Sequence, residues 1–233
     1  MFEGLLKKVQ QYRGPLSSAE IAHGMNAARE NAVRLAKDAR LLFENERYAS
    51  ALALAVLSIE EAGKEPVLRG LAVASDDKQL QERWRDYRSH TRKNALWPLP
   101  YLFQQGASLP EDFLPMFEPK AKHPQMLDMV KQISLYTDTF QKGQWSLPEQ
   151  KIPKKLAEGI VKVAEIFSST RQITTEEIDL WIQYMKPAWN SADTVRDKAQ
   201  MEWDKEMRRR GLIKEGTALS VETFFTQGYK KPR

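Results

Sequence analysis

SSAEIAHGMNAARENAVRLAKDARLLFE, residues 17 to 44, is the stretch that decides the fold. Ser17 followed three residues later by Glu20 forms a capping box, which marks the start of a helix. Beyond it, apolar residues recur at intervals of three and four, which predicts one long amphipathic helix. These apolar positions are Ile21, Met25, Ala28, Ala32, Leu35, Ala39 and Leu42.

A second helix is expected from about Tyr48. Its apolar stripe is wide, because Leu54 and Leu57 extend the row that Leu52 and Val56 begin. Such width predicts a central helix that packs on more than one side. Pro66 lacks an amide hydrogen and should bend this helix near Gly63.

Further helical patterns follow along the whole chain, and no strand alternation stands out. We expect a third helix from about Ser75 to Pro98, a proline-rich stretch over residues 98–124, and a fourth helix over residues 124–140. Three more helices are expected after Pro153, after Thr174 and from Asn190 to Arg210. The class is therefore all-α, with an antiparallel bundle over residues 1–150 and a helical extension with a loosely packed tail over residues 151–233.

The composition is that of a soluble globular protein with a mild positive bias. The 233 residues carry 36 basic and 31 acidic side chains, which permits contact with nucleic acid without requiring it. The sequence holds no cysteine, which fits a reducing compartment. The longest strongly apolar run, residues 51–57, is far shorter than the roughly 20 residues of a membrane span. We therefore expect a cytoplasmic protein that does not enter a membrane.

The side chains best suited to catalysis are concentrated in RWRDYRSHTRKN, residues 83 to 94. His90 is one of three histidines in the chain, and histidine is the side chain best suited to move protons near neutral pH. Arg85 and Arg83 both precede it, with four and six residues between each arginine and the histidine. A histidine with nearby arginines can hold a phosphate and handle the proton of a ribose hydroxyl without a metal ion.

On one continuous helix, Arg83, Asp86, His90 and Asn94 lie near one line, with Lys93 beside it. Asp86 would then orient His90 from one turn away. Arg85 would stand about 140 degrees from His90, so this geometry favours Arg83 as the site arginine. A solvated basic helix face explains the same pattern.

Glu60 and Lys64 are four residues apart on the second helix, which predicts an ion pair between them. Charges are costly on a central, apolar helix unless they face a cleft or each other. A polar pocket between the second and third helices would explain these residues together with His90.

Several spaced motifs resemble one family. They are YASA at residues 48–51, SIEEAGK at 58–64, SHTRK at 89–93, KQISLYTD at 131–138 and GQWSLP at 143–148. In this order they are similar to the AbiV family of phage abortive-infection proteins, which belongs to the HEPN superfamily. The resemblance covers about residues 20–150 and implies a HEPN-like helical bundle, often dimeric.

Many members of that superfamily are metal-independent ribonucleases, so the resemblance implies RNA as the substrate, a cyclic phosphate as product, and no cofactor. It implies Arg85 and His90 as the catalytic pair. Glu60, Glu61 and Lys64 match the family's motif on the second helix, and Lys93 matches its histidine-to-lysine spacing. Asp86, Asn94 and Arg83 remain supporting residues, and the choice between Arg83 and Arg85 stays open. A phage protein is a candidate trigger.

Two other functions compete with this one. Some HEPN domains are inactive, so the chain could instead be a non-catalytic module that binds a phage or host protein, or RNA, and blocks translation or phage growth by occupancy. A di-iron bundle is a weaker alternative, because Glu20 and His23 give one Glu-x-x-His where two are usual. Arg208 to Arg210 could follow an RNA backbone, although a cationic helix end is the simpler explanation.

Overall fold

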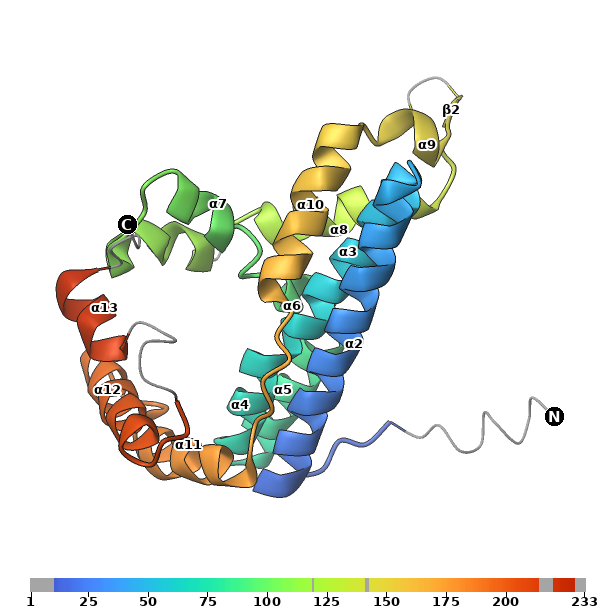
Figure 1. Ribbon diagram of the computed structural model, residues 1–233. Helices are drawn as coiled ribbons and strands as arrows, with labels where there is room; N and C mark the ends of the chain where they lie inside the picture. The colour runs from blue at the N-terminus through green and yellow to red at the C-terminus, as the bar shows by residue number, and fades with distance from the viewer. Residues whose placement is uncertain (1–10, 119, 141–142, 214–219, 229–233) are drawn as a thin grey trace.

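The structure is a computed structural model that describes residues 11–118, 120–140, 143–213 and 220–228. The short apolar pattern expected near the N-terminus, Phe2 to Val9, lies outside these residues. The first long helix, α2 (Ser18–Glu44), begins with the expected capping box between Ser17 and Glu20. A tight turn at residues 45–47, with Glu46 at a positive φ of 60°, reverses the chain into α3 (Tyr48–Ala62), which runs back along α2 (Figure 1).

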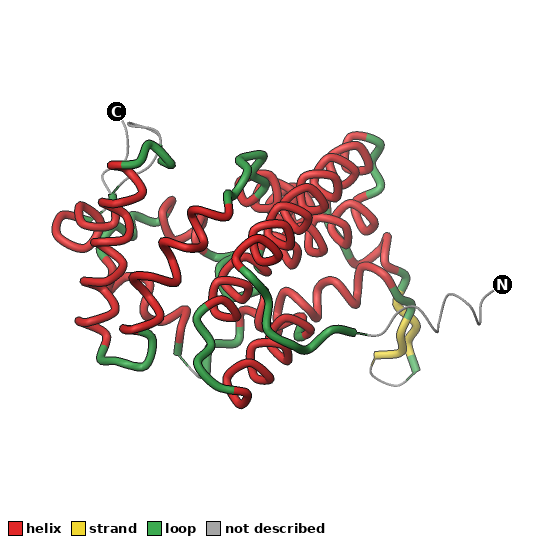
Figure 2. Tube along the Cα trace, turned by 90° about the horizontal axis from the view of Figure 1, so that it is seen from below, coloured by secondary structure: helices red, strands yellow, loops and turns green. Residues whose placement is uncertain are grey.

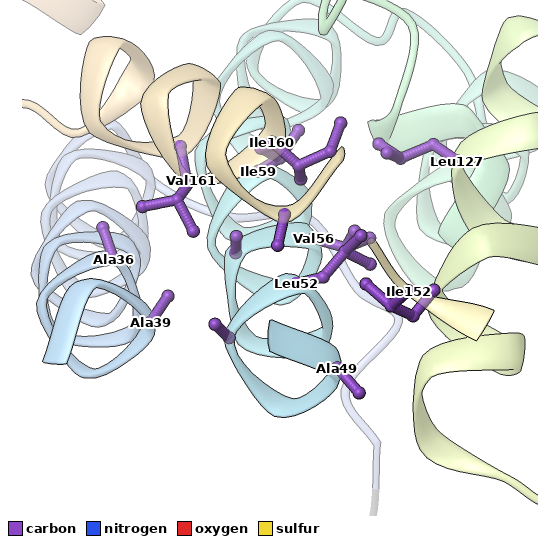
Figure 3. Close-up of a cluster of buried hydrophobic side chains, with 14 residues drawn as sticks. Ala36, Ala39, Ala49, Leu52, Val56, Ile59, Leu127, Ile152, Ile160 and Val161 are labelled. Atoms are coloured by element: carbon purple, nitrogen blue, oxygen red, sulfur yellow. The ribbon is translucent and has the colours of Figure 1, made fainter. Parts of the chain in front are cut away.

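The main core lies where α2 and α3 meet α8 (His123–Leu135) and α10 (Lys154–Phe167). Small alanines on α2 and α3 allow the two helices to pack closely, and the larger side chains of α3, α8 and α10 fill the space between (Figure 3). The wide apolar stripe of α3 is thus covered on more than one side, as predicted. Ile160 and Val161 of α10 belong to this core although they follow residue 150.

The second helix ends where Pro66 predicted a bend. Gly63 separates α3 from α4 (Lys64–Ala72), and its backbone touches the chain again at Lys93. A Cβ atom built on Gly63 would lie 1.9 Å from the carbonyl oxygen of Lys93, so no larger residue fits there. The φ of Gly63 is −67°, which any residue can adopt, so the backbone conformation does not require glycine here. Glycine is required because there is no space for a side chain.

The third helix is not continuous, which corrects the sequence prediction. It divides into α5 (Asp77–Arg88) and a single turn, α6 (His90–Lys93), with Ser89 in extended conformation between them. The Ser89 hydroxyl accepts a hydrogen bond from the amide of Arg92 and so begins the new turn. A side chain that caps a new helix holds its residue in a non-helical conformation, so the helix before it ends there. The alignment of residues 83, 86, 90 and 94 on one face therefore does not hold.

The proline-rich stretch forms two short elements, α7 (Leu99–Gln104) and the 3₁₀ helix η1 (Pro110–Phe117). After α8, the chain makes a small hairpin that the sequence analysis missed. Strand β1 (Asp138–Phe140) pairs antiparallel with β2 (Gln144–Ser146), with Thr139 opposite Trp145 (Figure 2). Gly143 supplies the positive φ of 78° that the turn requires. A short helix, α9 (Pro148–Lys151), leads into α10. The all-α class is otherwise confirmed.

The C-terminal helices α11 (Thr175–Ala188), α12 (Asp193–Arg209) and α13 (Val221–Gln227) leave the bundle and curve back toward η1 (Figure 1). Ile178 of α11 packs into a buried apolar cluster with Met25 of α2 and Leu68 of α4. Beside it, the guanidinium of Arg69 of α4 lies 4.9 Å from the ring of Trp181 and 5.0 Å from that of Trp203. At the far end, the rings of Phe224 and Phe113 lie 5.9 Å apart. No helix among the described residues is long and apolar enough to cross a membrane.

Candidate functional site

The site is built around Glu60, a carboxylate on the last turn of α3 that is only 3% exposed. Its two oxygens take different partners. Oε1 accepts a hydrogen bond of 2.5 Å from Nζ of Lys131 on α8, and Oε2 lies 2.7 Å from Nδ1 of His90 on α6. Three elements that are far apart in the sequence therefore meet at one buried carboxylate, which links the second helix to the histidine as the sequence suggested.

The expected pair between Glu60 and Lys64 is not formed. Lys64 instead pairs with Glu61 at 2.6 Å, on the partly exposed side of the α3–α4 bend. Glu60 points inward to Lys131, which also lies 2.8 Å from Asp128. A buried carboxylate needs a partner that is also out of water, and Lys64 is not placed to provide one.

His90 is the first residue of α6, and its side chain is 59% exposed. Because the Glu60 carboxylate can only accept, Nδ1 of His90 carries the hydrogen in their bond. The neutral ring then has Nε2 as its acceptor, and no described residue binds that nitrogen. The structure thus holds one side of the imidazole in the protein and leaves a proton-accepting nitrogen open.

Asp86 does not orient His90, contrary to the prediction from a continuous helix. Its carboxylate lies 3.0 Å from Arg83 and 3.6 Å from Arg92. The break at Ser89 changes the direction of the chain between Asp86 and His90, so one helical turn no longer joins them. Glu60 takes the orienting position instead.

The pKa values of two lysines around Glu60 are shifted in opposite directions. Desolvation lowers the pKa of Lys93, which is 8% exposed, and Glu60 opposes that shift in part while Lys64 adds to it. Desolvation also acts to lower the pKa of Lys131, but the hydrogen bonds with Asp128 and Glu60 outweigh it, and that pKa is raised. Lys131 is therefore firmly held as a cation beside Glu60.

Asn94 lies behind this network. It is completely buried at the end of α6, and neither its amide nitrogen nor its amide oxygen has a hydrogen-bond partner among the described residues. It is a neighbour of the site in the interior and does not line its surface.

The two candidate arginines have different surroundings. Arg83 is 35% exposed, pairs with Asp86 and packs along Gly70, where an added Cβ would meet its Cδ at 2.9 Å. The Arg85 side chain is 76% exposed, and its nearest carboxylate, that of Glu82, is 3.8 Å away. Arg83 is thus part of the packing between α4 and α5, whereas Arg85 is available to an incoming group.

Both arginines line an open hollow of about 510 Å³, which we call the arginine hollow. Its other lining residues are Glu82, Asp86, Ser89 and Arg92. Three guanidinium groups face two carboxylates there, so the hollow is cationic. It lies directly before His90 in the chain and can accept a phosphate group.

Lys131, Asp128 and Arg92 were not predicted as site residues from the sequence. A signal for Lys131 was present, since it shares the buried face of α8 with Leu127 and Ser134, and a lysine on such a face usually has a buried partner. Arg92 carried no comparable signal, because its position depends on the break at Ser89.

The other residues considered from the sequence lie elsewhere. Glu20 is bound to Ser17 in the capping box, and the described residues contain no group of three or more histidine, cysteine or acidic side chains suited to a metal ion. The C-terminal arginines all contact carboxylates: Arg208 pairs with Asp204, Arg209 with Glu206, and Arg210 with Glu176 and Glu206.

Comparison with protein families gave one decisive result. The family model described as AbiV, a HEPN family, matches residues 20–169. The chain belongs to the AbiV family. The AbiV match runs from α2 to the end of α10, so it includes Glu60, His90, Lys131 and the arginine hollow, while α11 to α13 lie outside it. Comparisons with curated proteins and with solved structures found no match.

Proposed function

We propose that this AbiV protein is a metal-independent endoribonuclease of phage defence that acts in the cytoplasm. The observation that carries the proposal is the bond between His90 and Glu60. It fixes one imidazole nitrogen on a buried carboxylate and leaves Nε2 open, which is the arrangement of a general base with its orienting partner. Membership of the AbiV family supports the role in abortive infection.

In the proposed reaction, Nε2 of His90 takes the proton of a ribose 2′-hydroxyl. The 2′-oxygen then attacks the adjacent phosphorus, and the bond from phosphorus to the 5′-oxygen of the next nucleotide breaks. Once that oxygen gains a proton, the products are a 2′,3′-cyclic phosphate and a 5′-hydroxyl. Arg85 would hold the phosphate and offset the negative charge that develops on it.

The proposal includes a homodimer, because the reaction requires both a base and an acid. One copy of the chain presents a single exposed histidine beside the arginine hollow. If two copies bring their α5–α6 segments together, the second His90 can protonate the leaving oxygen. The high exposure of Arg85 and His90 is consistent with a surface that a second copy completes.

The direct test incubates purified protein with cellular RNA in the presence of a chelator. Cleavage should occur with the wild-type chain and fall by at least about 100-fold in His90→Ala. His23→Ala is the matched control, since His23 is an exposed histidine of α2 outside the network, and it should cleave normally. If the wild-type chain leaves RNA intact while His90→Ala still protects cells from phage, the protein acts instead as a non-catalytic binding module.

A further inference from the structure

A second hollow is lined by residues that follow His90 in the chain. Its volume is about 620 Å³, and its lining includes Thr91, Arg92, Met116, Phe117, Pro124 and Gln125. We call it the Phe117 hollow. Arg92 lines both hollows, Ser89 lines the arginine hollow, and Thr91 lines the Phe117 hollow. In the chain, His90 therefore stands between Ser89 of the arginine hollow and Thr91 of the Phe117 hollow.

The two hollows differ in chemistry. The arginine hollow has three guanidinium groups against two carboxylates. The Phe117 hollow contains one cation, Arg92, and one carboxylate, Glu118, so its charges balance. A phosphate suits the first, whereas the second favours an uncharged group with apolar faces and polar edges.

Phe117 provides a flat apolar surface for such a group. It ends η1, and 60% of it is exposed, although its neighbour Met116 is buried and anchors the segment. Gln125, near the start of α8, lines the same hollow and offers an amide. Aromatic rings that stand beside cationic grooves are the usual stacking platforms for unpaired nucleobases.

We propose that the Phe117 hollow binds one unpaired nucleobase of the RNA, stacked on Phe117, while the adjoining phosphate occupies the arginine hollow. This inference rests on the proposed ribonuclease function. It specifies the substrate as single-stranded RNA, because a base inside a duplex cannot turn its face to a side chain. Arg92 would contact the backbone between the two hollows.

The test measures binding separately from cleavage. Fluorescence anisotropy with His90→Ala as the parent chain keeps the RNA intact. Three probes are compared: a single strand, the same strand with its bases removed at successive positions, which keeps the backbone charge, and the matched duplex, which carries the phosphates of two strands. The parent should prefer the intact single strand. Adding Phe117→Ala should weaken that binding about 5- to 150-fold and remove the preference over the abasic strand.

Two variants make the result specific. Phe117→Trp should restore binding, since it keeps an aromatic face. Leu114→Ala, which removes an apolar side chain that is 61% exposed on the same 3₁₀ helix but outside the hollow, should change nothing. Equal binding of the duplex, or unchanged binding after Phe117→Ala, would overturn the inference.

The outcomes also separate this inference from the function on which it rests. If the wild-type chain cleaves RNA and the Phe117→Ala substitution changes neither binding nor cleavage, the proposed base site is wrong and the proposed ribonuclease activity stands. If binding depends on Phe117 but the wild-type chain cleaves nothing, the base site stands and the catalytic proposal is wrong. Absence of RNA binding in every arm contradicts both.

Discussion

Among single residues, the position of His90 depends on a carboxylate that is buried away from water. A buried charge is tolerated only when it is paired, and Glu60 is paired twice. Lys131 places a positive charge beside one oxygen of the carboxylate, and the other oxygen holds His90. The same network therefore serves stability and positions the histidine.

Replacing Lys131 by methionine should destabilise the fold by about 3 to 5 kcal/mol, because Glu60 would lose its buried cation. Urea unfolding measures the change. Lys162→Met is the matched control, since it breaks an exposed pair with Glu158 on α10 and should cost less than about 1 kcal/mol. Equal losses for the two variants would show that the Glu60 network adds no special stability.

The raised pKa of Lys131 gives this contribution a definite pH dependence. A lysine whose pKa is higher in the folded state stabilises the protein fully below its unfolded value of 10.5, and the contribution is lost as the pH rises through the folded value. The stability difference between the wild-type chain and Lys131→Met should thus be constant from pH 7 to 9 and shrink at higher pH. Urea unfolding across that range measures it, and a difference that grows with pH would contradict the assignment.

Separate alanine substitutions of Arg83 and Arg85 should have different effects on cleavage and on stability. Arg85→Ala should lower cleavage by about 100-fold with little change in unfolding free energy, because its side chain is exposed and would act only on the phosphate. Arg83→Ala should lower stability, since it loses the contacts with Asp86 and Gly70, and retain most of the cleavage. Rates and urea midpoints of both variants decide the matter, and the reverse pattern would make Arg83 the site arginine.

At the scale of elements, the site exists because two helices are interrupted. The α3–α4 bend at Gly63 and the α5–α6 break at Ser89 allow the backbone of Lys93 to touch Gly63 and bring His90 over Glu60. The bend was predictable, because proline has a fixed effect on a helix. The break was not, since no proline or glycine marks Ser89, and its cause is a side-chain cap that only the folded chain reveals. The angular comparison of Arg83 and Arg85 failed for that reason.

Gly63→Ala should test this contact. The added methyl group would push α6 away from α3, which should cost about 1 to 3 kcal/mol or more and weaken the bond between His90 and Glu60. Cleavage should fall together with stability. Gly159→Ala on α10 is the control, because nothing lies within 4 Å of the added carbon, and alanine there should stabilise the helix by up to about 1 kcal/mol. Thermal unfolding of both variants provides the comparison. If Gly63→Ala is as stable as Gly159→Ala, the close contact between Gly63 and Lys93 is contradicted.

At the scale of the whole molecule, periodicity predicted the helices and their order well. Caps and apolar spacing are local signals, and they locate α2, α3, α10, α11 and α12 to within a few residues. The start of α8 is also correct, but this helix ends at Leu135 and not at residue 140 as expected, because residues 138–140 form β1. The hairpin of β1 and β2 was missed because three-residue strands carry too short a pattern. The division near residue 150 stays a prediction: α10 packs on α2 and α3, and Ile178 of α11 packs on α2 and α4.

The proposed homodimer makes a quantitative prediction. If each cleavage site requires both copies, an excess of His90→Ala chains will trap wild-type chains in mixed dimers. Cleavage should then fall more steeply than the wild-type fraction, provided that the chains are unfolded and refolded together before the assay. Light scattering should report twice the chain mass of 26.9 kDa. Activity in simple proportion to the wild-type fraction would indicate a site complete within one chain.

The most direct test of the central claim, that His90 removes the proton of a ribose 2′-hydroxyl, is the chemistry of the cleaved ends. A single-stranded RNA is cleaved in chelator and its fragments are analysed by mass spectrometry, beside the same strand with the 2′-hydroxyl at the cleaved position methylated. We expect 2′,3′-cyclic phosphate and 5′-hydroxyl ends, no cleavage at the methylated position, and none with His90→Ala. Fragments that carry 5′-phosphates, or cleavage that survives methylation, would contradict it.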